Sequence, residues 1–231
     1  WIDIPVLDSF GFRQAQTAIS AFYILKDGIA LDYQTPVLGQ PWSIPFEFPT
    51  YQVLTALVAS TSIPLDVAGR IVSYGFFLAC LIPIRSILLS LGFQRDAFYI
   101  VSSLFLSSSL YVFWSRTVMI ESAALFFCVL WLALVARYIF TSTFSGTSSG
   151  NSSGGSFGAW IIVGALAAGT LGVLTKATTF PAFCVVGCLF VVLRLRQGVA
   201  DLRDLQRLGW RRAATLCCVT LAMCLIPIVF G

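Results

Sequence analysis

The sequence places ionisable side chains in short segments that could bind a phosphate or move a proton. The first segment is DSFGFRQAQTA at residues 8–18. It places a carboxylate, a guanidinium and two amides close together in the sequence: Asp8, Arg13, Gln14 and Gln16. A carboxylate here could take a proton from an acceptor hydroxyl while the guanidinium binds a phosphate or a sugar. The alternative is that Asp8 caps a turn and Arg13 extends to lipid head groups.

A second segment, PFEFPTYQ at residues 45–52, holds a carboxylate between aromatic residues and prolines. Prolines fix the backbone, and aromatic neighbours partly remove water from Glu47. This setting suits a general acid, a ligand for a divalent metal or a partner for an arginine. The alternative is structural, with Glu47 holding its loop onto Arg70 or Arg116.

Two further segments lie at the ends of apolar stretches. In SRTVMIES, residues 115–122, Arg116 and Glu121 are five positions apart and would be offset around one continuous helix. We therefore predict a break near Arg116, with both side chains facing one cavity; the alternative is that they pair with each other as a structural lock. In GVLTKATTFP, Lys176 could meet an anionic head group of a substrate, or extend to lipid phosphate.

Composition shows what kind of protein must position these residues. Of 231 residues, 58% are hydrophobic and 10% charged, against about 25% charged in soluble domains. The chain contains no histidine, which excludes imidazole metal sites and histidine-based catalysis within it. Its seven cysteines all fall in apolar stretches, so no disulfide framework is predicted. The sequence predicts an all-α, polytopic transmembrane helical bundle.

The chain divides into a polar first part and an apolar second part. Residues 1–50 are predicted to form an extracytoplasmic loop, in which Gln14–Leu25 has the spacing of a short amphipathic helix lying on the membrane surface. Residues 51–231 are predicted to form the bundle. Because the chain begins at Trp1 and stops within an apolar run, we expect a fragment that lacks a first span and a C-terminal part.

About six stretches of the second part approach the ~20 residues that a helix needs to cross a bilayer. They are residues 67–91, 97–115, 118–140, 158–175, 177–193 and 213–230. Tyr51–Ile63 is too short and is predicted to be re-entrant or interfacial, and Pro83 is predicted to kink the first span. Residues 142–157 are rich in serine and glycine and are predicted to be a flexible linker.

Basic residues indicate the orientation, because lysine and arginine in short loops stay on the cytoplasmic side. The loop before the last span is rich in arginine: Arg194, Arg196, Arg203, Arg207, Arg211 and Arg212. Counting back from it places Arg85, Arg95, Arg137 and the linker 142–157 in the cytoplasm as well. The charged residues named above for chemistry, together with Arg70, then lie outside. Charges at span ends are costly unless they are paired or face a wet cavity, so we predict that they share one.

At these same segments the sequence resembles the GT-C superfamily of membrane glycosyltransferases, in particular bacterial protein O-mannosyltransferases and aminoarabinose-transferase-like enzymes. The matching features run from Asp8 to Lys176. They are FRQAQTA with a following helix that ends in KDG, then FEFP, SRTVMIES and GVLTK. The resemblance implies a polytopic helical fold in the bacterial inner membrane, where a polyprenyl-phosphate sugar enters from the bilayer and is transferred on the extracytoplasmic face.

The resemblance also implies roles for individual residues. The family places a catalytic aspartate in the first outer loop, commonly in an Asp-Glu pair, and the register of Thr17-Ala18 puts that pair at Arg13-Gln14. Because this is a departure, the base role passes to Asp8. Glu47 matches the family's Phe-Glu-x-Pro acid, and Lys176 matches its Leu-x-Lys motif.

The resulting hypothesis is a hexosyl or pentosyl transferase that acts on a glycan, lipid or protein acceptor. Asp8 and Glu47 are the predicted catalytic residues, with a divalent metal at Glu47 left open. The predicted substrate-binding residues are Arg13, Gln14, Gln16, Arg70, Arg116, Glu121 and Lys176. The rivals are a transporter or lipid-carrier flippase, and a scaffold whose outer loop binds a partner protein. Membrane lipids are expected partners, and nucleic acid is not.

Overall fold

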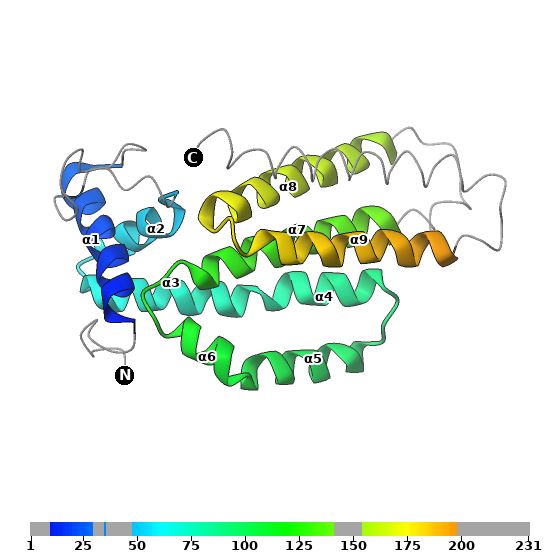
Figure 1. Cartoon of the computed structure of the whole chain (residues 1–231), viewed down its shortest axis with the longest axis horizontal. Coiled ribbons are helices and arrows are strands. Elements are labelled where there is room, and N and C mark those ends of the chain that lie inside the picture. The colour runs from blue at the N-terminus through cyan, green and yellow to red at the C-terminus, as the bar shows by residue number, and fades with distance from the viewer. Residues whose placement is uncertain (1–9, 30–34, 36–47, 141–153, 198–231) are drawn as a thin grey trace.

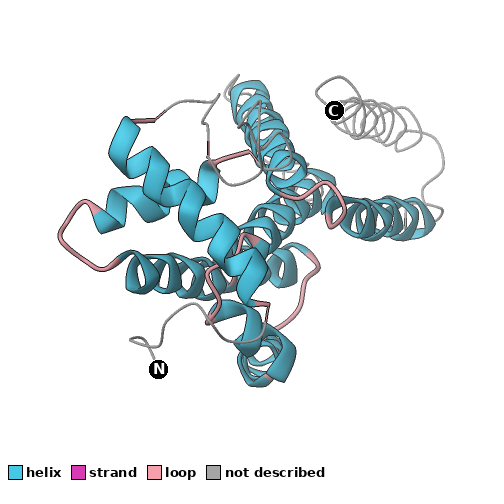
Figure 2. Cartoon of the chain, turned by 60° about the vertical axis from the view of Figure 1, so that its left-hand side comes forward, coloured by secondary structure: helices cyan, strands magenta, loops and turns pink. Residues whose placement is uncertain are grey.

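The structure, a computed structural model, describes residues 10–29, 35, 48–140 and 154–197, with only the backbone of 154–157 and 194–197. Within these residues all regular secondary structure is α-helical, as predicted (Figures 1 and 2). The helices are α1 (Gly11–Asp27), α2 (Thr50–Ala59), α3 (Leu65–Ala79), α4 (Leu81–Ser90), α5 (Arg95–Ser107), α6 (Ser109–Ser115), α7 (Glu121–Phe140), α8 (Gly154–Thr175) and α9 (Phe180–Gln197).

Three helical stretches are long and apolar enough to cross a membrane. They are Leu65–Ser90, formed by α3 and α4, then α7, and Gly158–Thr175 within α8. These stretches confirm three of the predicted spans to within a few residues. The fifth predicted span corresponds to α9, whose apolar part Phe180–Leu193 is shorter, and the sixth lies outside the described residues. The chain therefore carries the helices of a membrane protein, while its orientation stays a prediction.

Two of the apolar stretches each consist of two helices. The helices α3 and α4 meet at Cys80, where the backbone stays helical, three residues before Pro83, whose missing N–H leaves the carbonyl of Ala79 without its helical partner. The predicted span over 97–115 corresponds to α5 and α6, which together are long and apolar enough to cross a membrane but are bent by 65° at Ser108. Ser108 lies in a run of three serines, whose hydroxyls compete for backbone hydrogen bonds; that of Ser107 bonds the carbonyl of Leu104 at 3.3 Å.

The helix α7 is the centre of the bundle and packs against α3, α4, α8 and α9. Its span is 61% buried, whereas those of α3–α4 and α8 are only 28% and 33% buried. The core includes Cys128, Trp131 and Val135 of α7 with Phe180 of α9. Large apolar side chains such as Ile82, Leu104 and Trp160 are exposed on the outer helices. This pattern suits a bundle whose outer face meets lipid rather than water.

The amphipathic helix predicted at Gln14–Leu25 is confirmed as α1, which runs across one end of the bundle (Figure 1). It ends at Gly28, whose φ of 97° is readily adopted only by glycine. Its inner face packs on α2 and α3. That this helix lies on a membrane surface stays a prediction.

The two ends of the bundle are formed by different helices and turns. At one, the junction end, lie α1, α2, the start of α3, the turn 116–120, the start of α7 and the turn between α8 and α9 (Figure 1). At the opposite end lie the turn between α4 and α5 and the last turns of α7 and α9. The charged residues that the sequence analysis selected for chemistry, so far as they are described, belong to elements of the junction end.

Candidate functional site

A side chain of α1 fixes that helix to the turn between α6 and α7. The side-chain oxygen of Gln14 accepts a hydrogen bond from the backbone N–H of Val118 at 2.9 Å, and Gln14 is fully buried. Beside it, the ring of Phe10 packs on Trp114 at 5.5 Å between centroids. A buried backbone N–H in a turn needs an acceptor, and Gln14 supplies it from 104 positions away. The helix α1 is therefore anchored at this turn.

A buried hydrogen-bond network joins α2 and α3 to the same turn. The hydroxyl of Tyr51 donates to the carbonyl of Gly69 at 2.8 Å and lies 2.9 Å from the hydroxyl of Ser73. Ser73 donates to the carbonyl of Thr117 at 2.7 Å. A Cβ at Gly69 would lie 2.6 Å from Cγ1 of Val118, so only glycine permits this close approach. The network holds three elements in one arrangement.

The environment of Tyr51 shows that Glu121 lies close to this network. Burial raises the pKa of the Tyr51 phenol above its ordinary value, while the hydrogen bond with Ser73 acts in the opposite direction. The negative charge of Glu121 adds to the rise in pKa. Tyr51 is therefore neutral at physiological pH, and its role here is to donate a hydrogen bond rather than to act as a base.

The charged centre of the junction end is an ion pair between the end of α8 and the start of α7. The ammonium nitrogen of Lys176 lies 2.8 Å from Oε1 of Glu121, and the two side chains are 26% and 14% exposed. The second oxygen of Glu121 is buried and has no hydrogen-bond partner among the described residues. The Lys176 ammonium has three donors, of which Glu121 takes one. The partly exposed ammonium of Lys176 thus keeps donors that an anion can use.

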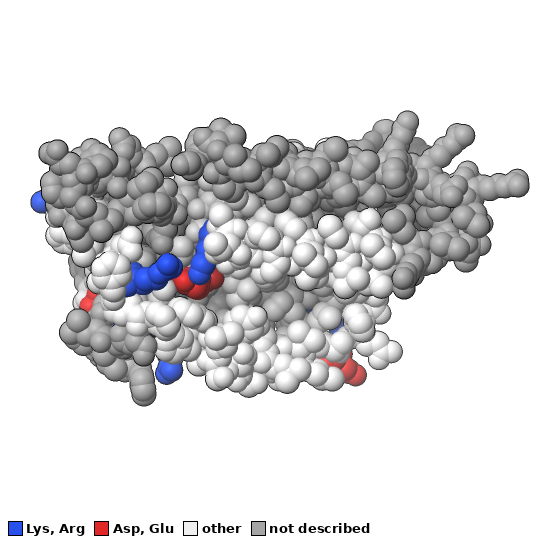
Figure 3. Space-filling model, viewed as in Figure 1, with Lys and Arg blue, Asp and Glu red and all other residues white. Residues whose placement is uncertain are grey.

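Other predicted residues on elements of the junction end differ in their exposure. Arg116 is exposed on the turn 116–120, where the predicted break occurs, while Glu121 pairs with Lys176. On α1, Arg13 is exposed and Gln16 is half-buried. Figure 3 shows basic and acidic atoms together at this end and an uncharged surface over much of the middle of the described helices.

The remaining predicted residues are buried or lie outside the described residues. Arg70 is 6% exposed and follows Gly69 on the buried face of α3. Gln14 is inside the junction rather than on its surface, which gives it a structural function. Asp8 and Glu47 lie outside the described residues, so their catalytic roles stay predictions. The described residues after them are placed at the site: Phe10 packs on Trp114, and the backbone N–H of Phe48 meets the carbonyl of Leu174 at 3.4 Å.

Sequence reasoning did not identify Tyr51, Gly69 and Ser73 as part of this site. A signal was present, because Gly69 and Ser73 are one helical turn apart on a membrane helix. Such small residues at four-residue spacing let another backbone approach closely. The close contact between α3 and the turn 116–120 is the result.

A metal centre finds no support in the part of the chain that the structure describes. No group of three or more acidic or cysteine side chains there could hold an ion. A divalent metal at Glu47 stays open, since that residue lies outside the described ranges.

The resemblance to GT-C glycosyltransferases depends on short segments, and the structure brings FRQAQTA, SRTVMIES and GVLTK to one end of the bundle. Together they supply an ion pair with spare hydrogen-bonding capacity and two exposed arginines. Comparison of the chain with family models, with curated proteins and with solved structures gives no match, so its function must be argued from its own residues.

Proposed function

We propose that this chain belongs to a glycosyltransferase that moves a hexosyl or pentosyl unit from a polyprenyl-phosphate donor to an acceptor at the junction end. The observation that carries the proposal is the Lys176–Glu121 ion pair, formed by residues 55 positions apart at the ends of two membrane-length helices. A lipid-linked donor holds its phosphate at the same depth, next to the hydrocarbon. The extracytoplasmic face of a bacterial inner membrane is the proposed location.

Lys176 is the proposed contact for the donor phosphate. Glu121 fixes the ammonium in place and leaves two of its donors for phosphate oxygens. The exposed guanidinium groups of Arg13 and Arg116 add positive charge at the same end. Cations held in position stabilise the charge that develops on the leaving phosphate, which is commonly a large catalytic effect.

The proposed reaction is a single displacement at the anomeric carbon. The acceptor oxygen or nitrogen forms a bond to that carbon, the bond between the carbon and the phosphate oxygen breaks, and its electron pair leaves with polyprenyl phosphate. The acceptor proton passes to Asp8 as general base, and Glu47 orients a cation. The placement of Phe10 and Phe48 at the site supports these assignments, because Asp8 and Glu47 come one or two positions before them. The sugar carbon is inverted.

The test is an assay of the full chain with a panel of polyprenyl-phosphate sugars, in which released polyprenyl phosphate is measured. Asp8→Asn should lower release by about 10²–10⁴-fold, the usual contribution of a general base, and should leave membrane insertion intact. Asp27→Asn is the matched control, since Asp27 is an exposed acid at the other end of α1. Equal turnover of the Asp8→Asn variant and the unchanged chain would remove Asp8 from the mechanism.

A lipid-carrier flippase or transporter is the second candidate, and the 65° bend between α5 and α6 favours it, because transporters use broken helices. The same panel in sealed vesicles separates the two functions. Transfer releases polyprenyl phosphate. Transport moves the intact sugar-lipid to the other leaflet without releasing it, and that result would replace the transferase proposal.

A further inference from the structure

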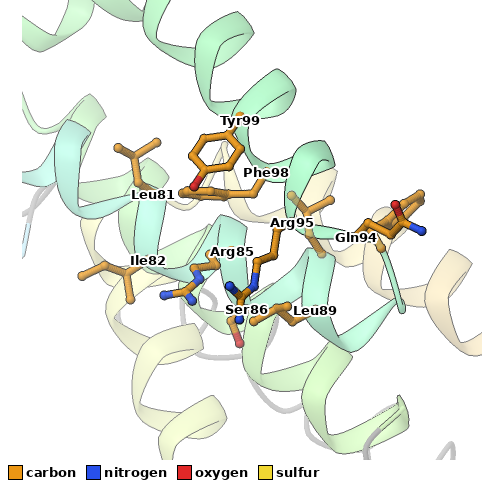
Figure 4. Close-up of a pocket in the computed structure, with 11 residues that line it drawn as sticks. Leu81, Ile82, Arg85, Ser86, Leu89, Gln94, Arg95, Phe98 and Tyr99 are labelled. Carbon is orange, nitrogen blue, oxygen red and sulfur yellow. The ribbon is translucent and has the colours of Figure 1, made fainter.

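A second polar site lies at the opposite end of the bundle, in a pocket between α4 and α5 (Figure 4). Its volume of about 680 Å³ lies within the range of small-molecule sites. Arg85 and Ser86 line it from α4, and Arg95 lines it from the first turn of α5. Figure 4 shows both guanidinium groups directed into the same space beside Ser86.

Among the described residues, no acid balances the charge in this pocket. Arg85 and Arg95 are both exposed, and neither forms an ion pair within the described part of the chain. Asp96 is the acid next to Arg95 in the sequence, yet it too is exposed and makes no described ion pair. The N-terminus of α5 adds the positive end of a helix dipole. Two cations that share a pocket repel each other, and an anion between them would remove that repulsion.

The surroundings of the two arginines are apolar and aromatic. Around the pocket, Ile82 is 73% exposed, Tyr99 66% and Leu89 56%. The Leu65–Ser90 span is 26 residues long, or about 39 Å at the rise of an α-helix, against ~30 Å of hydrocarbon core. Its last turns, which carry Arg85 and Leu89, therefore reach the depth of lipid head groups. The pocket thus suits a ligand with an anionic head and a hydrocarbon tail.

We infer that this pocket binds the phosphate head group of an anionic membrane phospholipid. The phosphate lies between Arg85 and Arg95 with Ser86 as a further donor, and the acyl chains follow the exposed apolar face of α4 and α5. Basic pockets between membrane helices are a known means of holding such head groups. The inference is independent of the transferase proposal, because its residues lie at the other end of the bundle.

The test measures thermal unfolding of the full chain in detergent with one of three additives: cardiolipin, phosphatidylcholine or inorganic phosphate. A ligand that binds the folded state raises the unfolding midpoint. We expect cardiolipin to raise it and the other two to leave it unchanged. Arg85→Gln and Arg95→Gln should each weaken the apparent affinity for cardiolipin about fivefold. Arg137→Gln is the matched control, an exposed arginine in the last turn of α7 at the same end.

Native mass spectrometry supplies a second measurement that does not depend on stability. The unchanged chain and the Arg137→Gln variant should retain a cardiolipin molecule that the double Arg85→Gln, Arg95→Gln variant loses. Equal retention by the double variant would overturn the inference. An equal rise of the unfolding midpoint with inorganic phosphate would also overturn it, because the ligand would then be a soluble anion rather than a lipid.

Discussion

The two ends of the bundle differ in whether their charged side chains are paired within the described part of the chain. At the junction end, Lys176 and Glu121 pair with each other, and Gln14 satisfies a backbone donor of the turn 116–120. At the opposite end, Arg85 and Arg95 share a pocket without an acid partner among the described residues. The junction end is held by bonds within the chain. Within the described part of the chain, the opposite end presents two cations that no acid pairs.

This difference separates residues that hold the junction end together from residues that are proposed to bind ligand. Tyr51, Gly69 and Ser73 are buried and bonded across elements, so their loss should lower stability. Lys176 is partly exposed and keeps donors to spare, so its loss should chiefly lower turnover. Substitutions at both kinds of position, each with a control on the same or a comparable helix, test whether stability and turnover respond separately.

Among the described residues of the junction end, replacing Lys176 should give the largest effect. Lys176→Met removes the central cation, and turnover should fall by about 10²–10³-fold, as for other positioned groups that stabilise a leaving charge. Released polyprenyl phosphate is the measurement. Lys26→Met is the control, since Lys26 is an exposed lysine in the last turn of α1. Unchanged turnover of the Lys176→Met variant would contradict the role of the ion pair in donor binding.

A double variant at Lys176 and Glu121 distinguishes the loss of a ligand contact from the effect of leaving the Glu121 carboxylate without its partner. Lys176→Met leaves the carboxylate of Glu121 half-buried without its partner, which by itself destabilises the junction. Adding Glu121→Gln removes that charge. If turnover recovers in the double variant, Lys176 serves only to neutralise Glu121. If turnover stays low while the unfolding midpoint recovers, Lys176 acts on the donor.

Replacing Gly69 should give the next effect, on stability. The Cβ of Gly69→Ala would lie 2.6 Å from Cγ1 of Val118, so α3 and the turn 116–120 must move apart. Overpacking of this kind costs about 1–3 kcal/mol. Gly75 on the same helix has open space around it, so Gly75→Ala should be neutral or slightly stabilising. Equal unfolding midpoints for the two variants in detergent would show that the close approach is not needed.

Much of the fold could be predicted because the ends of helices carry local signals. Gly28 ends α1, and the apolar run 118–140 gave α7 to within three residues at its start. The bend at Ser108 was missed because the apolar run continues through it, although a run of three serines marks the place. The local pattern of apolar and polar residues therefore predicts where a helix can form. It predicts less well where a helix bends.

The partners within the site could not be predicted from the sequence. Glu121 could pair with Arg116, five positions away, or with a distant cation, and only the packing of α8 on α7 selects Lys176. Gln14 was identified as a polar residue with ligand-binding capacity, but its buried bond to Val118 depends on how α1 crosses the bundle. Spacing identifies polar residues, while tertiary contacts decide which of them remain available to a ligand.

The smallest effect is expected for the hydroxyl of Tyr51. Tyr51→Phe removes its hydrogen bond to Gly69 and its contact with Ser73, but Ser73 keeps its bond to Thr117. The free energy of unfolding should therefore fall by only about 1 kcal/mol, the net value of one hydrogen bond. Tyr74→Phe, at an exposed position of α3, should have no effect. Because the phenol stays neutral, the loss should not change between pH 6 and 9, a range well below the ordinary tyrosine pKa of about 10. A loss that grows with pH over that range would show that Tyr51 ionises and would assign it to the reactive part of the site.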